Sequence, residues 1–287
     1  MKIPMNTGKV IIFVSWLLQE RGIKSSSVES YLSGLKTLHR TEGHNPPEIR
    51  PDLVKSILAG AKNYDNIQDR IRPKSKRLPM SMSALRVLKN ELNNLDMTKS
   101  DIRMMWAVSC LAFFGSFRMG ELLAEAPNSY DKVFTCLAKD VDLKDNTIRV
   151  RVKNPKEDRA GRDLIIDVFK NDGDCCPVKA LGKWWMSEPL REDDKPCFRF
   201  ADGANLSKRC FNNILTKCLA KHVPTGTGFY SGHSFRAGIP SMLGEMGYSD
   251  DDIRTVGRWS SNSYELYVKM PRTKRQKMAK EIAAWKN

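Results

Sequence analysis

The sequence contains no apolar run long enough to cross a membrane. Its longest runs, Val10–Leu18 and Met104–Phe117, are interrupted by polar or small residues. Both fall short of the ~20 residues that a spanning helix needs. The first run follows Lys2 and Lys9, but Gln-Glu-Arg at positions 19–21 stands where a signal peptide would have small residues. We therefore expect buried helices, no membrane partner and an intracellular protein.

Paired cysteine motifs are also missing. Cysteine occurs seven times, an odd number, and no two cysteines have CxxC spacing. Without an export signal, this pattern favours reduced thiols inside the fold over a disulfide framework. Cys218 and His222 have the spacing of neighbours on one helix face, which leaves a zinc site as a minor alternative. We expect no metal and no cofactor.

What the sequence has in excess is positive charge. Its 287 residues include 48 Lys+Arg against 33 Asp+Glu, a net charge of +15, within an ordinary 41% hydrophobic composition. Residues 1–79 carry 14 basic and 7 acidic side chains, residues 80–270 carry 28 and 25, and residues 271–287 carry 6 and 1. Clustered positive charge is typical of proteins that bind a polyanion, and it favours nucleic acid over a membrane surface.

Apolar periodicity predicts a helical N-terminal unit. One helix is expected from a Thr7 cap to about residue 22, and a second begins at the capping-box pair Ser26 and Glu29 and stops near residue 43. A third helix is expected to run toward Tyr64. Five basic residues then lie between Arg70 and Arg77, and this segment is predicted to be a linker.

The rest of the chain combines helices with a short alternating stretch. Residues 147–152 and 163–168 alternate apolar and polar side chains, which predicts two strands of a β-hairpin. Helices are expected around the hairpin, over residues 83–95, 101–114, 119–125, 177–186, 207–222, 233–246, 250–256 and 273–285. The predicted fold class is mainly α with a small antiparallel β-sheet.

Three segments place polar residues where helix packing does not require them. Arg118 follows an apolar helix and lies three residues before Glu121, so the two can pair on one helix face. His233 and Arg236 have the same spacing at a helix N-terminus, whose free N–H groups favour an anion. The third segment contributes an indole and two hydroxyls, from Trp259, Tyr264 and Tyr267. Each segment alone also suits a local ion pair or core packing, and the order of all three is the specific signal.

In this order the motifs resemble those of the tyrosine recombinases (phage-type integrases), most closely those of Crypton and DIRS-type mobile elements. The family order is Arg-x-x-Glu, a hairpin Lys, His-x-x-Arg, Trp or His, and Tyr. The matching residues are Arg118, Glu121, Lys156, His233, Arg236, Trp259 and Tyr267. The resemblance covers nearly the whole chain. It implies a helical SAM-like core-binding domain (1–68), a basic linker (69–79), a mixed α/β tyrosine-recombinase catalytic domain (80–270) and a C-terminal basic helix (271–287).

The resemblance implies a site-specific DNA recombinase or integrase of a mobile element, acting on double-stranded DNA as a homo-tetramer through a Holliday junction. Arg118 and Arg236 would clamp phosphate oxygens, and Glu121 would orient Arg118. His233 and Trp259 would add hydrogen bonds. Tyr267 would attack phosphorus to form a 3′-phosphotyrosyl link, and Lys156 would protonate the leaving 5′-oxygen.

Several points stay open in the sequence. Tyr267 lies eight residues after Trp259, whereas many relatives have nine, which here is Val268; Tyr264 is the alternative nucleophile. Lys153 is the alternative to Lys156. The C-terminal helix either docks onto a neighbouring protomer or folds back on its own domain. A type IB topoisomerase and a catalytically silent DNA-binding protein are the alternative functions.

DNA contacts are expected from the linker and from one helix start, at Arg70, Arg72, Lys74, Lys76, Arg77, Lys208 and Arg209. For Arg254 and Arg258, phosphate contact and solvated surface are both open. The expected compartment is the nucleus in a eukaryote, and the cytoplasm or nucleoid otherwise.

Overall fold

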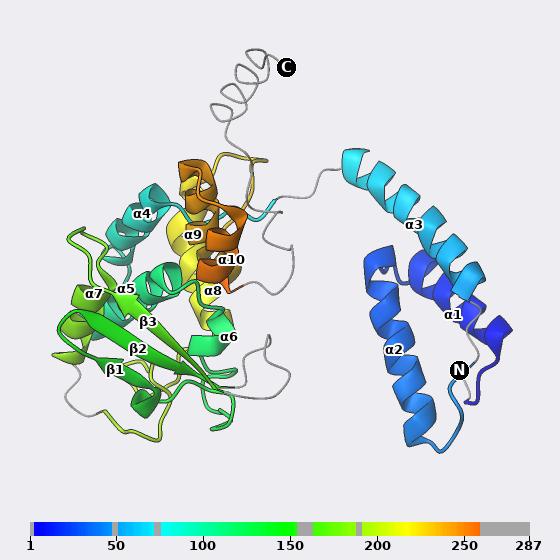
Figure 1. The fold of residues 1–287 in the computed structure, drawn as a ribbon, viewed down its shortest axis with the longest axis horizontal. Helices are drawn as coiled ribbons and strands as arrows, with labels where there is room; N and C mark the ends of the chain where they lie inside the picture. The colour runs from blue at the N-terminus through cyan, green and yellow to red at the C-terminus, as the bar shows by residue number, and fades with distance from the viewer. Residues whose placement is uncertain (1–2, 48–50, 72–75, 154–162, 188–190, 259–287) are drawn as a thin grey trace, which may run out of the picture. The chain divides into compact units, whose positions relative to one another are not determined.

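The computed structural model describes residues 3–47, 51–71, 76–153, 163–187 and 191–258 (Figure 1). The chain divides into two compact units, Met1–Lys74 and Ser75–Asn287. In the part of the chain that the structure describes, no helix is long and apolar enough to cross a membrane.

The first unit is built from three helices, α1 (Thr7–Gln19), α2 (Ser25–Thr41) and α3 (Pro51–Ile71) (Figure 1). Apolar residues spaced three and four apart turn to one side of each helix. They form a small separate core of Met5, Val10, Val14, Leu17, Val28, Leu32, Leu35 and Val54. The buried His39 ring ties the chain before α1 to α2, because its Nε2 accepts from the Met5 backbone N–H at 2.9 Å.

The helix ends of this unit differ from those predicted. Asn6, rather than Thr7, caps α1 by accepting from the Lys9 amide at 3.0 Å. The capping box at Ser26 is not formed, because α2 begins one residue earlier and the Ser25 amide donates to Asp65 on α3 at 2.9 Å. Helix α3 continues past Tyr64 to Ile71, since no glycine or proline interrupts it there.

The second unit contains one antiparallel sheet of β1 (Val141–Leu143), β2 (Thr147–Val152) and β3 (Leu164–Phe169), in that order. The hairpin prediction is confirmed, with Thr147 opposite Phe169 and Val152 opposite Leu164. The second strand lies one residue later than predicted, and β1 was not predicted because three residues are too few to show a period. Alternate side chains of β2 face the core.

Helix α5 (Lys99–Phe114) forms the centre of this unit and is buried over most of its length. Helix α7 (Pro177–Trp185) contacts both α5 and the sheet, while α4 (Met82–Leu92) and α9 (Gly232–Met246) pack on α5 (Figure 1). Helix α8 (Lys208–Leu219) packs on α4 and α9, and α10 (Asp250–Gly257) packs on α9. Two short 3₁₀ turns, η1 (Ala138–Asp140) and η2 (Ala220–His222), complete the described elements.

The short helix α6 (Met119–Leu122) ends three residues before its predicted end. Leu123 adopts an extended conformation, and Ala124 forms a β-bridge with Ser207 just before α8. This pairing with a distant segment stops the helix and brings α6 beside the start of α8.

All seven cysteines lie in the second unit, and none forms a disulfide. Burial disfavours the thiolate, so the pKa of Cys197 rises to about 12 and that of Cys218 to about 11. Among the described residues, no three His, Cys, Asp or Glu side chains come together in a way that could hold a metal ion.

Candidate active site

A sharp turn after α5 places Arg118 at the start of α6. Ser116 has a φ of 48°, in the left-handed region that residues other than glycine rarely adopt. Gly115 precedes it, and a Cβ there would collide with the ring of Phe117. The turn buries Phe117 and leaves Arg118 as the N-cap residue of α6.

Glu121 holds Arg118 through two contacts. Its Oε2 accepts from the Arg118 backbone N–H at 2.9 Å, and its Oε1 accepts from Arg118 Nη1 at 3.0 Å. The carboxylate is 9% exposed and the guanidinium side chain 30% exposed. Such a charge-assisted pair fixes the direction of the guanidinium.

Arg236 reaches the same turn from α9. Its side chain is fully buried, Nη1 donates to the Ser116 carbonyl oxygen at 2.9 Å, and Nη2 donates to the Arg258 carbonyl oxygen at 3.1 Å. Burying a guanidinium is costly unless its N–H groups are paired. Arg236 therefore links α9 to the α5–α6 turn and to the end of α10.

Arg258 is a third arginine of this cluster, and its solvated-surface interpretation is wrong. Its side chain is 15% exposed, and its Nη2 donates to Glu121 Oε2 at 3.0 Å and to the Ser116 carbonyl oxygen at 2.9 Å. The guanidinium also lies over the Phe117 ring, 5.2 Å from its centroid. The sequence left this residue open between phosphate contact and solvated surface, and the structure places it in the cluster.

His233 lies one turn before Arg236 on α9. Burial, together with the positive charges of Arg77, Arg236 and Arg118, lowers its pKa below the ordinary 6.5. The imidazole is therefore neutral at neutral pH, and one of its ring nitrogens is a hydrogen-bond acceptor. Arg77 is held near it because its main chain forms a β-bridge with Phe229 and its guanidinium lies 5.9 Å from the centre of that ring.

Positive charge exceeds negative charge at this cluster. Within the described contacts, two guanidiniums, those of Arg118 and Arg258, share the Glu121 carboxylate, and the guanidinium of Arg236 donates to backbone carbonyl oxygens. Lys208 adds an ammonium beside α6, since a Cβ added at Gly120 would lie 3.6 Å from Lys208 Nζ. Guanidiniums match the geometry of phosphate oxygens, so the arrangement suits an anion of that kind.

The structure thus brings together four residues of the sequence motifs, Arg118, Glu121, His233 and Arg236, with Arg77 and Lys208 from the predicted DNA contacts. Arg209 is exposed next to Lys208, Lys76 precedes Arg77, and Arg70 lies in α3. The remaining site residues lie outside the described residues: Arg72, Lys74, Lys156, Trp259 and Tyr267, with the alternative Tyr264.

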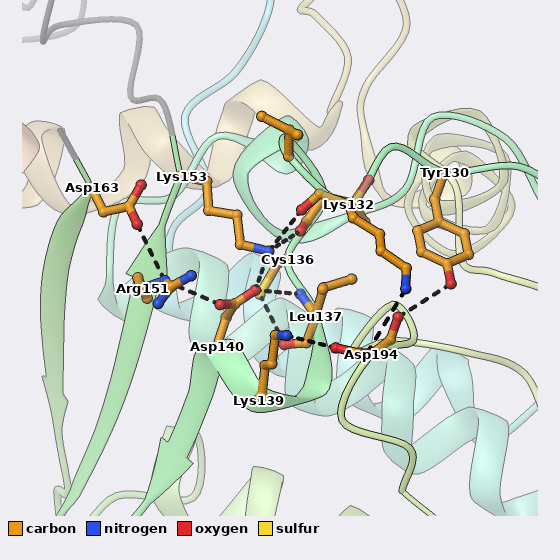
Figure 2. A network of polar contacts seen from close by, with 12 residues as sticks. Tyr130, Lys132, Cys136, Leu137, Lys139, Asp140, Arg151, Lys153, Asp163 and Asp194 are labelled. Carbon is orange, nitrogen blue, oxygen red and sulfur yellow. Dashed lines mark hydrogen bonds and ion pairs between the residues drawn. The ribbon is translucent and has the colours of Figure 1, made fainter. Parts of the chain in front are cut away.

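Lys153, the alternative to Lys156, is held in a network at the root of the hairpin (Figure 2). Its Nζ lies 2.6 Å from Asp140 Oδ2 and donates to the carbonyl oxygens of Lys132 at 3.0 Å and Thr135 at 3.1 Å. An ammonium has three N–H groups, so these contacts saturate it. With its side chain only 8% exposed, Lys153 is unsuited to act as a general acid.

Three solved structures share this architecture over most of the chain. The XerH site-specific recombinase bound to palindromic difH substrate, a post-cleavage complex, matches with a TM-score of 0.61 and 12% identity over 96% of this chain and 69% of that chain. The Tn1549 transposon integrase in complex with circular intermediate DNA matches with a TM-score of 0.58 and 11% identity, covering 96% and 85%. The chain has the tyrosine recombinase fold.

A lambda integrase dimer bound to a COC′ core site matches this tyrosine recombinase fold too, with a TM-score of 0.54 and 16% identity over 92% of this chain and 80% of that chain. No family model matches the sequence, and no curated protein matches it significantly. The predicted fold class, mainly α with a small antiparallel sheet, is confirmed. At these identities the likeness establishes the fold.

Proposed function

We propose that this chain is a tyrosine-type site-specific DNA recombinase. The observation that carries the proposal is the convergence of Arg118, His233 and Arg236 on one cationic cluster within the tyrosine recombinase fold. These residues come from segments more than a hundred positions apart, and they have the order and spacing of the recombinase motifs.

In the proposed reaction the Tyr267 hydroxyl oxygen attacks a backbone phosphorus of DNA. The phosphorus–O5′ bond breaks, leaving a 3′-phosphotyrosyl link and a 5′-hydroxyl. The phenol proton passes to neutral His233, and Lys156 supplies a proton to the departing O5′. Attack by the 5′-hydroxyl of another strand reverses these steps, so the covalent link conserves the bond energy and no nucleotide or metal is needed.

Arg118 and Arg236 act on the transition state, in which negative charge develops on the non-bridging oxygens. Both guanidiniums are already oriented, by Glu121 and by the Ser116 carbonyl. Preorganised donors need no rearrangement when the charge develops, and losing one typically costs ~3 kcal/mol of transition-state stabilisation. Replacing either arginine by lysine would keep the charge but lose the paired geometry.

The proposed partner is duplex DNA, bound with Lys76, Arg77 and Lys208 on its phosphates. The positions of Arg77 and Lys208 beside the cluster and the net charge of +15 support this. We further propose a homo-tetramer on DNA, with the basic segment 271–287 contacting a neighbouring protomer. The motif order supports a role in a mobile element of the Crypton or DIRS type.

Covalent trapping tests the proposal. The protein is incubated with nicked duplexes from a random-sequence pool, and DNA that stays attached under denaturing conditions is recovered and sequenced. We expect an enriched site, attached through its 3′-phosphate. Tyr267→Phe should abolish the adduct, and the matched variant Tyr264→Phe should retain it.

The same experiment separates the alternatives. Relaxation of supercoiled plasmid at concentrations too low for synapsis, with a Tyr267 adduct, would support a topoisomerase. Tight, salt-sensitive binding without any adduct would support a silent DNA-binding protein and refute the recombinase. Loss of the adduct with Tyr264→Phe alone would move the nucleophile by three residues.

A further inference from the structure

Arg258 contacts the two groups that accept hydrogen bonds from the proposed phosphate-binding arginines, the Glu121 carboxylate and the Ser116 carbonyl. Its Nη2 lies 3.0 Å from Glu121 Oε2, and the other oxygen of that carboxylate accepts from Arg118. The same nitrogen lies 2.9 Å from the Ser116 carbonyl oxygen, which also accepts from Arg236. One guanidinium nitrogen therefore bridges the two acceptors that orient Arg118 and Arg236.

The backbone of Arg258 takes part as well. Its carbonyl oxygen accepts from Arg236 Nη2 at 3.1 Å, so side chain and main chain are both fixed to the cluster.

Backbone strain points to the same residue. Among the residues that the structure describes, the only non-glycine residues with positive φ are Ser116, at 48°, and Arg258, at 53°. A helix that ends in this conformation normally has glycine there, because a Cβ is unfavourable. The two strained residues are hydrogen-bonded to each other, and strain that surrounding contacts maintain is typical of functional sites.

We propose that Arg258 is a positioning residue for DNA cleavage: it locks Arg118 and Arg236 into one phosphate-binding geometry. This inference rests on the proposed function. It predicts that removing the guanidinium slows the chemical step without weakening DNA binding. Misplacing reacting groups by about 1 Å can slow a reaction about a hundredfold.

The decisive comparison is between Arg258→Gly and Arg258→Ala. Both substitutions remove the guanidinium, but glycine relieves the backbone strain and alanine keeps it. The glycine variant should therefore unfold at a higher urea concentration than the alanine variant. Under single-turnover conditions on the trapped site, we expect both variants to form the adduct slower by the same factor, about a hundredfold. Added guanidinium ion, at concentrations below those that unfold the protein, should partly restore both rates.

Two further variants complete the test. Arg103→Ala removes one positive charge from exposed α5 surface and should cleave at the wild-type rate. Arg258→Lys keeps the charge on a flexible stem and should remain slow. DNA affinity is measured for every variant and should stay at the wild-type value.

The inference is overturned if the glycine variant cleaves at the wild-type rate, or if the rates of the glycine and alanine variants follow their stabilities. It is also overturned if the loss of rate equals the loss of DNA affinity. Absence of an adduct from the wild-type protein would instead refute the proposed function, so the two failures are distinguishable.

Discussion

The buried ion pair between Asp140 and Lys153 tests how strongly burial of an ion pair affects the free energy of unfolding. The Asp140 carboxylate is 1% exposed and lies 2.6 Å from Lys153 Nζ. It also accepts from the Leu137 amide at 2.8 Å and pairs with Arg151 Nε at 3.2 Å (Figure 2). Asp140→Asn keeps the shape of the side chain but leaves the Lys153 ammonium buried without its counter-charge. Removing one partner of a buried pair costs about 3–5 kcal/mol, so we expect a loss of unfolding free energy of that size.

The same sheet offers a matched control. Asp167 pairs with Arg149 at 2.9 Å, but these side chains are 34% and 52% exposed. An exposed pair contributes about 0–1 kcal/mol, so Asp167→Asn should cost little.

Urea unfolding followed by tryptophan fluorescence measures both losses. The double variant Asp140→Asn, Lys153→Met should be more stable than Asp140→Asn alone, because it removes the unpaired ammonium. Equal losses for Asp140→Asn and Asp167→Asn would refute the reasoning, since burial is the main difference between the two pairs.

Three further changes have defined outcomes. Glu121→Gln should lower the unfolding free energy by about 1–3 kcal/mol, because two guanidiniums lose a charged acceptor, and urea titration checks this. The pKa of His233 in the folded state lies below the ordinary 6.5, so folding opposes protonation and the wild type loses stability as the pH falls below that value. His233→Gln should lose less stability over the same interval, and a flat difference between the two thermal midpoints across pH would contradict this. Gly238→Ala should cost about 1–3 kcal/mol, because its Cβ would lie 2.5 Å from the Met80 carbonyl oxygen, whereas Gly34→Ala in the open interior of α2 should stabilise by about 0.5–1 kcal/mol; urea titration compares the two.

Much of the fold follows from local pattern. The strand Thr147–Val152 was predicted with its observed ends, because alternating arginines and buried apolar residues are visible in six letters. The end of α6 was not predictable, since it depends on the bridge between Ala124 and Ser207, which are 83 positions apart. The capping of α2 likewise depends on Asp65 of another helix.

The site, too, contains some residues whose place the sequence predicted and others whose place it did not. The order and spacing of Arg118, His233 and Arg236 predicted a common site, because they match motifs of a known family and can be recognised in the sequence. For Arg258 the sequence left two interpretations open, since the contacts of this residue depend on the packing of the end of α10 against the turn at Ser116. Lys156 was preferred to Lys153 because of the resemblance, and the structure adds only that Lys153 is buried in an ion pair, since Lys156 lies outside the described residues.

The reactivity of the cysteines can be used to measure local unfolding of the second unit. Every thiol lies between Cys110 and Cys218, six of the seven are buried, and the first unit has none. Buried, protonated thiols react slowly with alkylating reagents, so the labelling rate of each follows how often its surroundings open. Mass spectrometry of labelled peptides would therefore map the local opening of the second unit residue by residue, and unfolding of the first unit alone would leave the signal unchanged.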